Sequence, residues 1–192
     1  WLASVATGAA EPDPAWFGPV TAEAAGVPRG SEGLVFLPYL SGAGSPAFDT
    51  EARGAFLGLS MKHGRGHMLR AIVEGVTTDV AESIALLASV GARKRIVFTG
   101  GGSRIPFWTA LLADVPGLPV VNSAVADASA LGAGLIAGVG IGWFDGSFAV
   151  ARGLVAPRAT AVPAADPASG TALAARFRRA RAARRLDLLP EV

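Results

Sequence analysis

The sequence contains no cysteine among its 192 residues. Disulfide bonds and thiolate metal sites are therefore excluded, and because this composition suits a reducing compartment, we expect a cytoplasmic protein. The chain also lacks an initial methionine, and no basic segment followed by an apolar core occurs near its start. We therefore expect no targeting peptide, and we interpret a chain that begins at Trp1 as a piece of a longer protein.

A hydrophobic run long enough to span a membrane is missing too. The longest uncharged stretch lies between Asp127 and Asp145 and has 17 residues, whereas a membrane span needs about 20 apolar residues. Gly134 and Gly138 form a GxxxG pattern, but this pattern indicates helix dimerisation only inside a full-length apolar helix. We therefore predict a soluble helix that packs closely on a sheet, and no membrane partner.

Strong net charge is also absent, because the formal charge is only +2. From Gly170 onward the chain has six arginines and two acids, a local charge of +4 that leaves −2 for residues 1–169. Residues 171–192 are predicted to form a basic C-terminal helix with Leu173, Phe177 and Ala180 on one face. No aromatic residues alternate with the arginines, so we interpret them as a solvated face and expect no nucleic-acid partner.

Hydrophobic periodicity predicts alternating strands and helices. Apolar residues at steps of three or four indicate a long helix over residues 66–90, which Gly91 ends. Short apolar runs predict strands, and the other segments are read from turn residues and caps. The expected strands are 35–39, 55–59, 96–99 and 119–122, and the expected later helices are 106–115 and one that Asp127 or Ser129 caps. This alternation predicts a layered α/β domain with helices covering a mostly parallel central sheet.

Two segments have no clear periodicity. Residues 6–33 are rich in Gly, Pro, Ala and acids, and are predicted to be mostly loop with at most one short helix near residues 21–25. Residues 153–170 are predicted to form a Pro/Ala linker. The domain is therefore expected to cover residues 1–152, with the basic helix following the linker.

Three consecutive glycines, Gly100–Gly102, lie between a predicted strand and a predicted helix. Glycine allows backbone N–H groups to approach a ligand, and a helix N-terminus favours phosphate. Because one or two glycines suffice for a turn, a nucleotide site is favoured over a simple connection, with Ser103 as a further donor or a helix cap. The segment matches neither GxGxxG nor the Walker A motif, and no acid follows at the ribose spacing of dinucleotide-binding proteins.

Other candidates for chemistry are weaker. His63 and His67 have the i, i+4 spacing of a helical metal site, but Gly64 and Gly66 disfavour a helix there and no third ligand is evident. We therefore favour solvent-exposed or capping histidines and predict no metal site. No Ser-His-Asp set or carboxylate pair has a spacing that supports catalysis, so no catalytic residue is assigned.

An ordered set of motifs resembles the C-terminal domain of FGGY carbohydrate kinases. Within that family the pattern is most similar to xylulokinases and then to glycerol kinases, over roughly residues 34–145. The motifs are Phe36-Leu-Pro-Tyr-Leu-Ser-Gly-Ala-Gly-Ser-Pro46, Asp49, Ala52-Arg-Gly54, Phe56-Leu-Gly-Leu59, Arg70-Ala-Ile-Val-Glu-Gly75, Thr99-Gly-Gly-Gly-Ser103, Trp108, Ala113-Asp114 and Ala130-Leu-Gly-Ala133.

The resemblance implies an actin-like ATPase (ribonuclease H-like) domain, with a mixed sheet flanked by helices and incomplete at its N-terminus. It implies transfer of the γ-phosphoryl of Mg-ATP to a sugar or polyol hydroxyl, with a xylulose-like ketose favoured. The general base, the sugar pocket and the first phosphate loops of the family lie upstream of Trp1. The 192-residue chain is therefore expected to be inactive alone.

Site residues follow from the same resemblance. Gly100, Gly101, Gly102 and Ser103 would line the adenosine and α-phosphate, while Gly42, Gly44, Ser45 and Arg53 would form a loop on the cleft or phosphate side. An asparagine that holds the base in glycerol kinases is replaced by Ile105. ATP, Mg²⁺ and a sugar or polyol are the expected ligands, and homodimerisation is left open.

Two rival classes remain. The first is a non-catalytic, actin-like module for nucleotide binding or interaction, because the catalytic half is absent. The second is a dinucleotide oxidoreductase, which would require a ribose-binding acid that the sequence does not provide.

Overall fold

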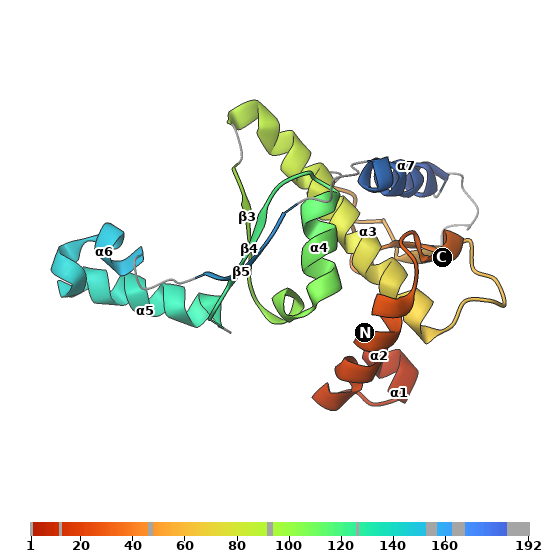
Figure 1. Ribbon diagram of the computed structural model, residues 1–192, viewed down its shortest axis with the longest axis horizontal. Coiled ribbons are helices and arrows are strands. Elements are labelled where there is room, and N and C mark those ends of the chain that lie inside the picture. Colours follow the sequence, from red (N-terminus) through yellow and green to blue (C-terminus); the bar gives the residue numbers. More distant parts are fainter. Residues whose placement is uncertain are drawn as a thin grey trace. The chain divides into compact units, whose positions relative to one another are not determined.

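The computed structural model describes residues 2–11, 13–45, 48–91, 94–125, 127–152, 157–162 and 168–183 (Figure 1). Two units follow from the contacts along the chain. Unit 1 comprises residues 1–90 and 166–192, and unit 2 comprises residues 91–165.

Unit 1 is mainly helical, and the helix α3 is its longest element. The helices are α1 (Leu2–Thr7), η1 (Pro14–Trp16), α2 (Phe17–Gly26), η2 (Ser31–Gly33), α3 (Arg65–Leu86), η3 (Leu87–Val90) and α7 (Ala168–Ala183), where η denotes a 3-10 helix. The prediction of one long helix over 66–90 is confirmed by α3 and the 3-10 turn that continues it.

Two short strands, β1 (Val35–Leu37) and β2 (Ala55–Leu57), pair antiparallel in unit 1. Side chains alternate across a strand, so successive residues of β1 contact different helices. Phe36 clusters with Ala71 of α3, whereas Leu37 clusters with Phe177 of α7. The hairpin therefore shares its core with both helices.

The crossing of β1 and α3 depends on Gly75. A Cβ at this position would lie 2.2 Å from the Phe36 carbonyl oxygen, a distance that no side chain tolerates. Gly75 therefore fixes how closely the strand approaches the helix.

The prediction of a mostly loop segment over residues 6–33 was wrong for its central part. Helix α2 begins at Phe17 and is ten residues long, so it extends well beyond the short helix expected near residues 21–25. Val20 and Ala24 of α2 are fully buried, and α2 packs on α3. Burial against another helix, which the local sequence does not reveal, stabilises this segment.

Unit 2 combines a three-stranded sheet with helices. Its elements are β3 (Ile96–Phe98), η4 (Gly101–Arg104), α4 (Pro106–Asp114), β4 (Val120–Ser123), α5 (Ala128–Gly140), η5 (Trp143–Gly146), α6 (Phe148–Arg152) and β5 (Pro157–Ala161). Leu112 and Ala113 of α4 pack on Val120 of β4, with Ile96, Phe98 and Ala161 around them. Helix α4 thus lies on the sheet, as Figure 1 shows.

The expected mostly parallel central sheet is not found in the described residues. The strands form a two-stranded antiparallel sheet in unit 1 and a mixed sheet in the order β3-β4-β5 in unit 2. Strand β3 is parallel to β4, and β5 is antiparallel to β4. The prediction of a linker over 153–170 was wrong for Pro157–Ala161, which forms strand β5 by pairing with β4.

The expected cap of the helix after β4 is present. The Asp127 carboxylate accepts a hydrogen bond of 2.9 Å from the Ala130 N–H, so Asp127 rather than Ser129 is the N-cap of α5. Within the described ranges, no helix is both long enough and apolar enough to cross a membrane.

Candidate functional site

The glycine-rich turn of unit 2 lies between β3 and α4. Strand β3 ends at Phe98, the 3-10 helix η4 begins at Gly101, and Pro106 occupies the first turn of α4. Because β3 and β4 are parallel, this turn and the end of β4 at Asn122 and Ser123 lie at the same edge of the sheet. The carboxyl ends of parallel strands are where open α/β sheets bind ligands.

Gly100 and Gly102 are required by the fold itself. Gly100 has φ +79° and ψ −169°, a conformation that only glycine adopts readily. A Cβ on Gly102 would lie 2.9 Å from the Trp108 ring and 3.0 Å from the Phe98 ring. These two rings pack edge to face with centroids 5.6 Å apart, so Gly102 leaves room for their contact.

Gly101 has no such requirement. A Cβ at Gly101 would meet no atom within 4 Å, and its φ lies outside the left-handed region. The residue is also exposed. Neither packing nor backbone conformation therefore requires glycine at this position.

Ser103 closes the turn rather than capping α4. Its backbone N–H and its hydroxyl both donate to the Gly100 carbonyl oxygen, at 3.2 and 2.7 Å. The N-cap of α4 is Ile105, which makes no side-chain capping bond. Pro106, the first residue of α4, has no N–H, and the Trp108 N–H donates to the Ile105 carbonyl oxygen at 3.1 Å.

A cavity of about 300 Å³ opens beside this turn, within the size range of small-molecule sites. Its lining comes from η4, α4, β4 and β5. The residues are Ser103, Arg104, Pro106, Thr109, Asn122, Thr160 and Ala161.

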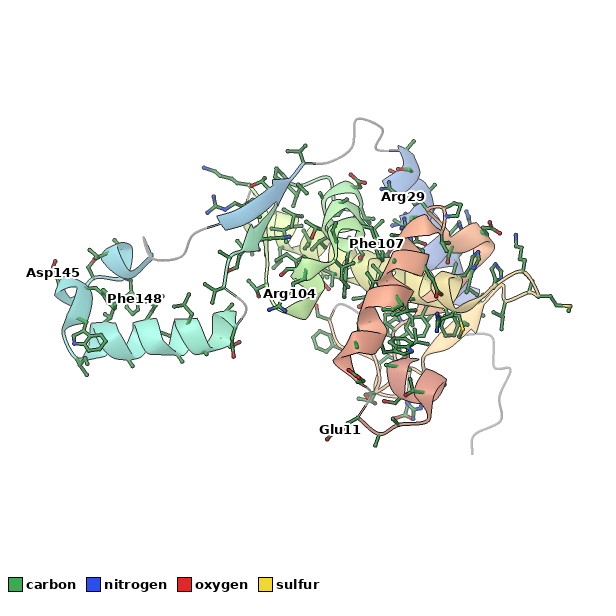
Figure 2. All side chains as sticks on the ribbon, turned by 60° about the horizontal axis from the view of Figure 1, so that its bottom comes forward. Glu11, Arg29, Arg104, Phe107, Asp145 and Phe148 are labelled. Carbon is green, nitrogen blue, oxygen red and sulfur yellow. The ribbon has the colours of Figure 1, made fainter. Side chains whose placement is uncertain are left out.

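Sequence reasoning missed most of this lining. Figure 2 labels the exposed Arg104 in the last turn of η4 and Phe107 in the first turn of α4. Arg104 lies two residues after the last of the three glycines, so the sequence could have indicated a positively charged side chain at the site. Thr109, Asn122 and Thr160 come from different elements, so no local pattern groups them.

The second set of predicted site residues lies in unit 1. Gly42, Gly44 and Ser45 belong to one loop, in which Ala43 and Asp49 exchange backbone hydrogen bonds of 2.7 and 2.9 Å. Gly42 has φ +87° and close backbone neighbours, whereas Gly44 and Ser45 are exposed. The Ser45 carbonyl accepts a bond of 3.3 Å from the Ser83 hydroxyl.

Arg53 lies near the same loop and is exposed. Its Nη1 donates to the carbonyl oxygens of Thr50 and Ala52 at 2.9 and 3.0 Å, and Nη2 lies 3.6 Å from Glu51 Oε2. The guanidinium therefore helps to order its own loop.

The two histidines stabilise the start of α3. Nδ1 of His63 accepts from the Ser60 N–H at 3.0 Å, and Nδ1 of His67 accepts from the Gly64 N–H at 3.2 Å. A neutral imidazole that accepts at Nδ1 carries its proton on Nε2. In this arrangement neither ring offers a free nitrogen lone pair, which favours the capping interpretation. No group of three or more His, Cys, Asp or Glu that could hold a metal occurs among the described residues.

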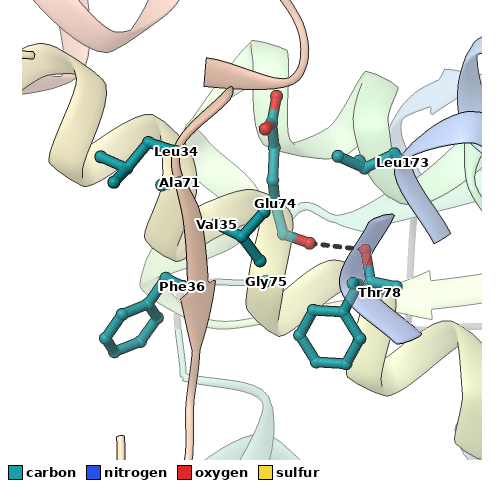
Figure 3. A pocket seen from close by; sticks show the side chains of 9 residues that line it. Leu34, Val35, Phe36, Ala71, Glu74, Gly75, Thr78 and Leu173 are labelled. Atoms are coloured by element: carbon teal, nitrogen blue, oxygen red, sulfur yellow. Dashed lines mark hydrogen bonds between the residues drawn. The ribbon is translucent and has the colours of Figure 1, made fainter. Parts of the chain in front are cut away.

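Figure 3 shows Glu74 of α3 beside β1. Its carboxylate forms a buried ion pair with Arg70 of the same helix. Glu74 Oε1 accepts from Arg70 Nε at 2.8 Å and from the Gly30 N–H at 2.9 Å, and both side chains are buried. The neighbouring cavity is only about 10 Å³, roughly one water molecule. We therefore interpret Arg70 and Glu74 as a structural pair that holds the turn before β1.

Shifted pKa values occur in a cluster between α3, α7 and the end of β1. Burial raises the pKa of the Asp79 carboxyl, which accepts a hydrogen bond of 3.1 Å from the Tyr39 hydroxyl. Burial also raises the pKa of Tyr39. Arg181 interacts with Tyr39 and with the Glu82 carboxylate. Every member of this cluster has a partner in the protein, so the cluster links α7 to α3.

Comparison with known proteins identifies the family to which the chain belongs. The C-terminal domain model of the FGGY family of carbohydrate kinases matches residues 2–141. Because this match covers more than half of the chain, the chain belongs to the FGGY family, and its predicted actin-like α/β fold is confirmed.

Individual relatives are xylulose and glycerol kinases. The chain is 37% identical over 120 residues to xylulose kinase of Bacillus subtilis, covering 62% of this chain and 24% of the relative. It is 40% identical over 129 residues to glycerol kinase of Acaryochloris marina, covering 66% and 25%. The crystal structure of xylulose kinase from Rhodospirillum rubrum matches with a TM-score of 0.76 and 35% identity over 95% of this chain and 36% of that chain. The chain thus spans about a quarter of the length of the curated relatives it matches.

Proposed function

We propose that this chain is the ATP-binding portion of a carbohydrate kinase, which transfers the γ-phosphoryl of Mg-ATP to a sugar or polyol hydroxyl. Membership of the FGGY family and similarity to xylulose and glycerol kinases support this class of reaction. A xylulose-like ketose is favoured, because the first relatives and several solved structures are xylulose kinases. A cytoplasmic location belongs to the same proposal.

The observation that carries the nucleotide assignment is Gly101. Of the three glycines in the turn, it alone is explained neither by backbone conformation nor by packing. A side chain here would point into open space at the carboxyl end of β3, where a nucleotide would lie against the backbone. The adjacent cavity of about 300 Å³, which Arg104 helps to line, suits an anionic small-molecule ligand.

In this proposal Gly100–Ser103 line the adenosine and α-phosphate of ATP. Mg²⁺ arrives bound to phosphate oxygens, its usual partners in phosphoryl transfer. Gly42, Gly44, Ser45 and Arg53 form a loop on the phosphate side of the complete protein.

The chain alone is proposed to be inactive. Phosphoryl transfer needs a base that orients the hydroxyl, donors around the γ-phosphate and a held metal. No catalytic residue is assigned in this chain, and the sugar would bind mainly to the upstream part of a longer protein. Strand β3 supports a longer protein, because its outer edge faces no described strand and Val97 is 60% exposed.

The rival proposal is a non-catalytic module for nucleotide binding or interaction. It shares the nucleotide turn, so ATP binding by the chain does not separate the two. The two proposals are separated by joining the chain to the upstream half of a related kinase and measuring sugar phosphorylation. A module without a catalytic role does not restore turnover.

Calorimetric titration of Mg-ATP into the chain tests the nucleotide assignment. We expect Gly101→Asp to abolish binding and Gly101→Ala to weaken it about tenfold, because both place atoms where the ligand approaches. Both variants should melt near the parent temperature, since a side chain at Gly101 meets no protein atom.

Gly132→Ala is the matched control, because a Cβ there also meets no atom within 4 Å and the residue lies inside α5. It should bind ATP as the parent does. Equal binding by Gly101→Asp and the parent, or no binding by the folded parent, would contradict the assignment.

A further inference from the structure

The buried side chain of Asn122 connects β4 to the glycine-rich turn. Asn122 is only 7% exposed, at the carboxyl end of β4. Its Nδ2 donates to the Ser103 carbonyl oxygen at 2.9 Å and to Thr109 Oγ1 at 3.1 Å. One nitrogen thus satisfies an acceptor in η4 and another in α4.

Only a carboxamide among side chains of this size makes both bonds. The Thr109 hydroxyl donates to the Ile105 carbonyl oxygen at 3.4 Å, so toward Asn122 it acts as an acceptor. Two acceptors require two N–H protons from one short side chain, which Asn has and Asp lacks. Asn122 is also the chain's single asparagine, and the chain has no glutamine.

The orientation of the Asn122 amide leaves its oxygen without a hydrogen bond from any described residue. Asn122 Oδ1 is buried and has no hydrogen-bond partner within the described part of the chain. An unsatisfied buried acceptor is unfavourable, so the two Nδ2 bonds must compensate for it. This arrangement favours a role for the amide in fixing its acceptors.

Ser103 connects Asn122 to the backbone of the glycine-rich turn. It binds the Gly100 carbonyl oxygen through both its N–H and its hydroxyl, while its own carbonyl is held by Asn122. Ile105 N–H completes the turn by donating to the Gly102 carbonyl oxygen at 3.0 Å. A residue 19 positions along the chain therefore determines where the turn lies relative to β4.

We propose that Asn122 is a positioning residue for nucleotide binding, acting through Ser103 on the backbone of Gly100–Gly102. This inference rests on the nucleotide function proposed above and deepens it. Asn122 sets the position of the turn's N–H groups before ATP arrives, so its loss weakens binding more than it weakens the fold.

The unaltered chain offers the first test, because Asn122 gives the only side-chain carboxamide signals in a ¹⁵N–¹H spectrum. We expect both amide protons to exchange with solvent at least tenfold more slowly than those of a free carboxamide, and to shift when Mg-ATP is added. Exchange at the rate of a free carboxamide would overturn the inference without any variant.

Two variants on the same strand separate positioning from stability. Asn122→Ala should speed exchange of the Ser103 and Ile105 backbone amides about tenfold and weaken Mg-ATP binding about five- to tenfold, the scale of one or two lost hydrogen bonds. Val120→Ala is the control, because Val120 is fully buried two residues earlier on the same face of β4 and its apolar side chain makes no hydrogen bond. It should lower the melting temperature but leave amide exchange in the turn and ATP affinity within twofold.

The outcomes distinguish this inference from the proposed function. If the parent binds Mg-ATP and folded Asn122→Ala binds it equally, the positioning role is wrong and the nucleotide site stands. If both variants weaken binding in proportion to lost stability, Asn122 has only a structural role. If the folded parent binds no Mg-ATP, the nucleotide function fails first, even where the amide exchange data show that Asn122 holds the turn.

Discussion

Gly100, Gly101 and Gly102 are identical in the sequence but differ in what their positions require. Backbone conformation explains the first, ring packing explains the third, and neither explains the second. From the sequence these three residues could only be treated as a group. The structure therefore narrows the nucleotide hypothesis to one position that the fold leaves free, where a substitution tests binding without disturbing folding.

The raised pKa of Asp79 predicts how the stability of the protein depends on pH. Burial raises the pKa of its carboxyl above the ordinary 3.8; Tyr39 and Arg181 oppose this shift, and Glu82 adds to it. The stabilisation that a raised carboxyl pKa represents is complete below the unfolded pKa and is lost as pH rises through the folded pKa. At pH 7 the half-buried carboxylate therefore costs stability, and Asp79→Asn, which keeps an acceptor for the Tyr39 hydroxyl, should be more stable than the parent.

Urea unfolding from pH 3 to pH 8 measures this difference. The advantage of Asp79→Asn should shrink as pH falls toward 3.8, where the parent carboxyl also becomes protonated. Glu11→Gln at an exposed position is the control and should unfold as the parent does at each pH. A variant that is less stable than the parent at pH 7 would show that attraction to Arg181 outweighs desolvation.

Helix α7 shows how far an apolar pattern predicts an element. Leu173 and Phe177 are buried as the pattern indicated, but the expectation of a solvated arginine face was only partly correct. Arg176 donates to the Gly30 carbonyl oxygen at 2.9 Å and Arg181 pairs with Glu82, whereas Arg178 and Arg179 are exposed. Arg184 and Arg185 lie outside the described residues.

Removal of the Phe177 ring should therefore destabilise unit 1. Phe177 is 2% exposed and packs with Leu37, Tyr39 and Ala52, so Phe177→Ala should lower the free energy of unfolding by about 3–5 kcal/mol. Arg178→Ala, one residue away on the exposed side, should change it by less than about 0.5 kcal/mol. Urea unfolding compares the two, and a small effect of Phe177→Ala would mean that α7 is not part of the core.

The sequence could predict the elements that have a local apolar pattern, but not those that depend on pairing with distant residues. Helix α3 and the strand–turn–helix unit of β3, η4 and α4 have periodic apolar residues and glycine boundaries, so they were predictable. Strand β5 consists of Pro-Arg-Ala-Thr-Ala and becomes a strand only by pairing with β4. The Asn122 bonds likewise depend on residues that the fold brings together, and no spacing rule predicts them.

At the scale of the whole molecule, the chain is a C-terminal FGGY domain about a quarter as long as its curated relatives. The nucleotide turn lies in unit 2, and the loop with Gly42, Gly44 and Ser45 lies in unit 1. Each unit has its own core, so each set of site residues can be altered and tested separately.

The chain alone should not phosphorylate sugars. With Mg-ATP and either xylulose or glycerol, a coupled assay should detect no sugar-dependent ADP formation, because no base for the hydroxyl is assigned in this chain. A heat-denatured sample sets the background rate. Sugar-dependent turnover by the chain, abolished in Gly101→Asp, would contradict this prediction and show that the chain itself contains a catalytic base.

The contact between Gly75 and the Phe36 carbonyl also bears on how such a domain can diversify. Because the strand touches the helix backbone directly at this point, the hairpin cannot slide along α3 when neighbouring segments change length. Insertions or deletions between β1 and β2 must then be absorbed by the loop that contains Gly42, Gly44 and Ser45. Related domains can thus differ in the length and sequence of this loop while the strand and helix beneath it keep the same register.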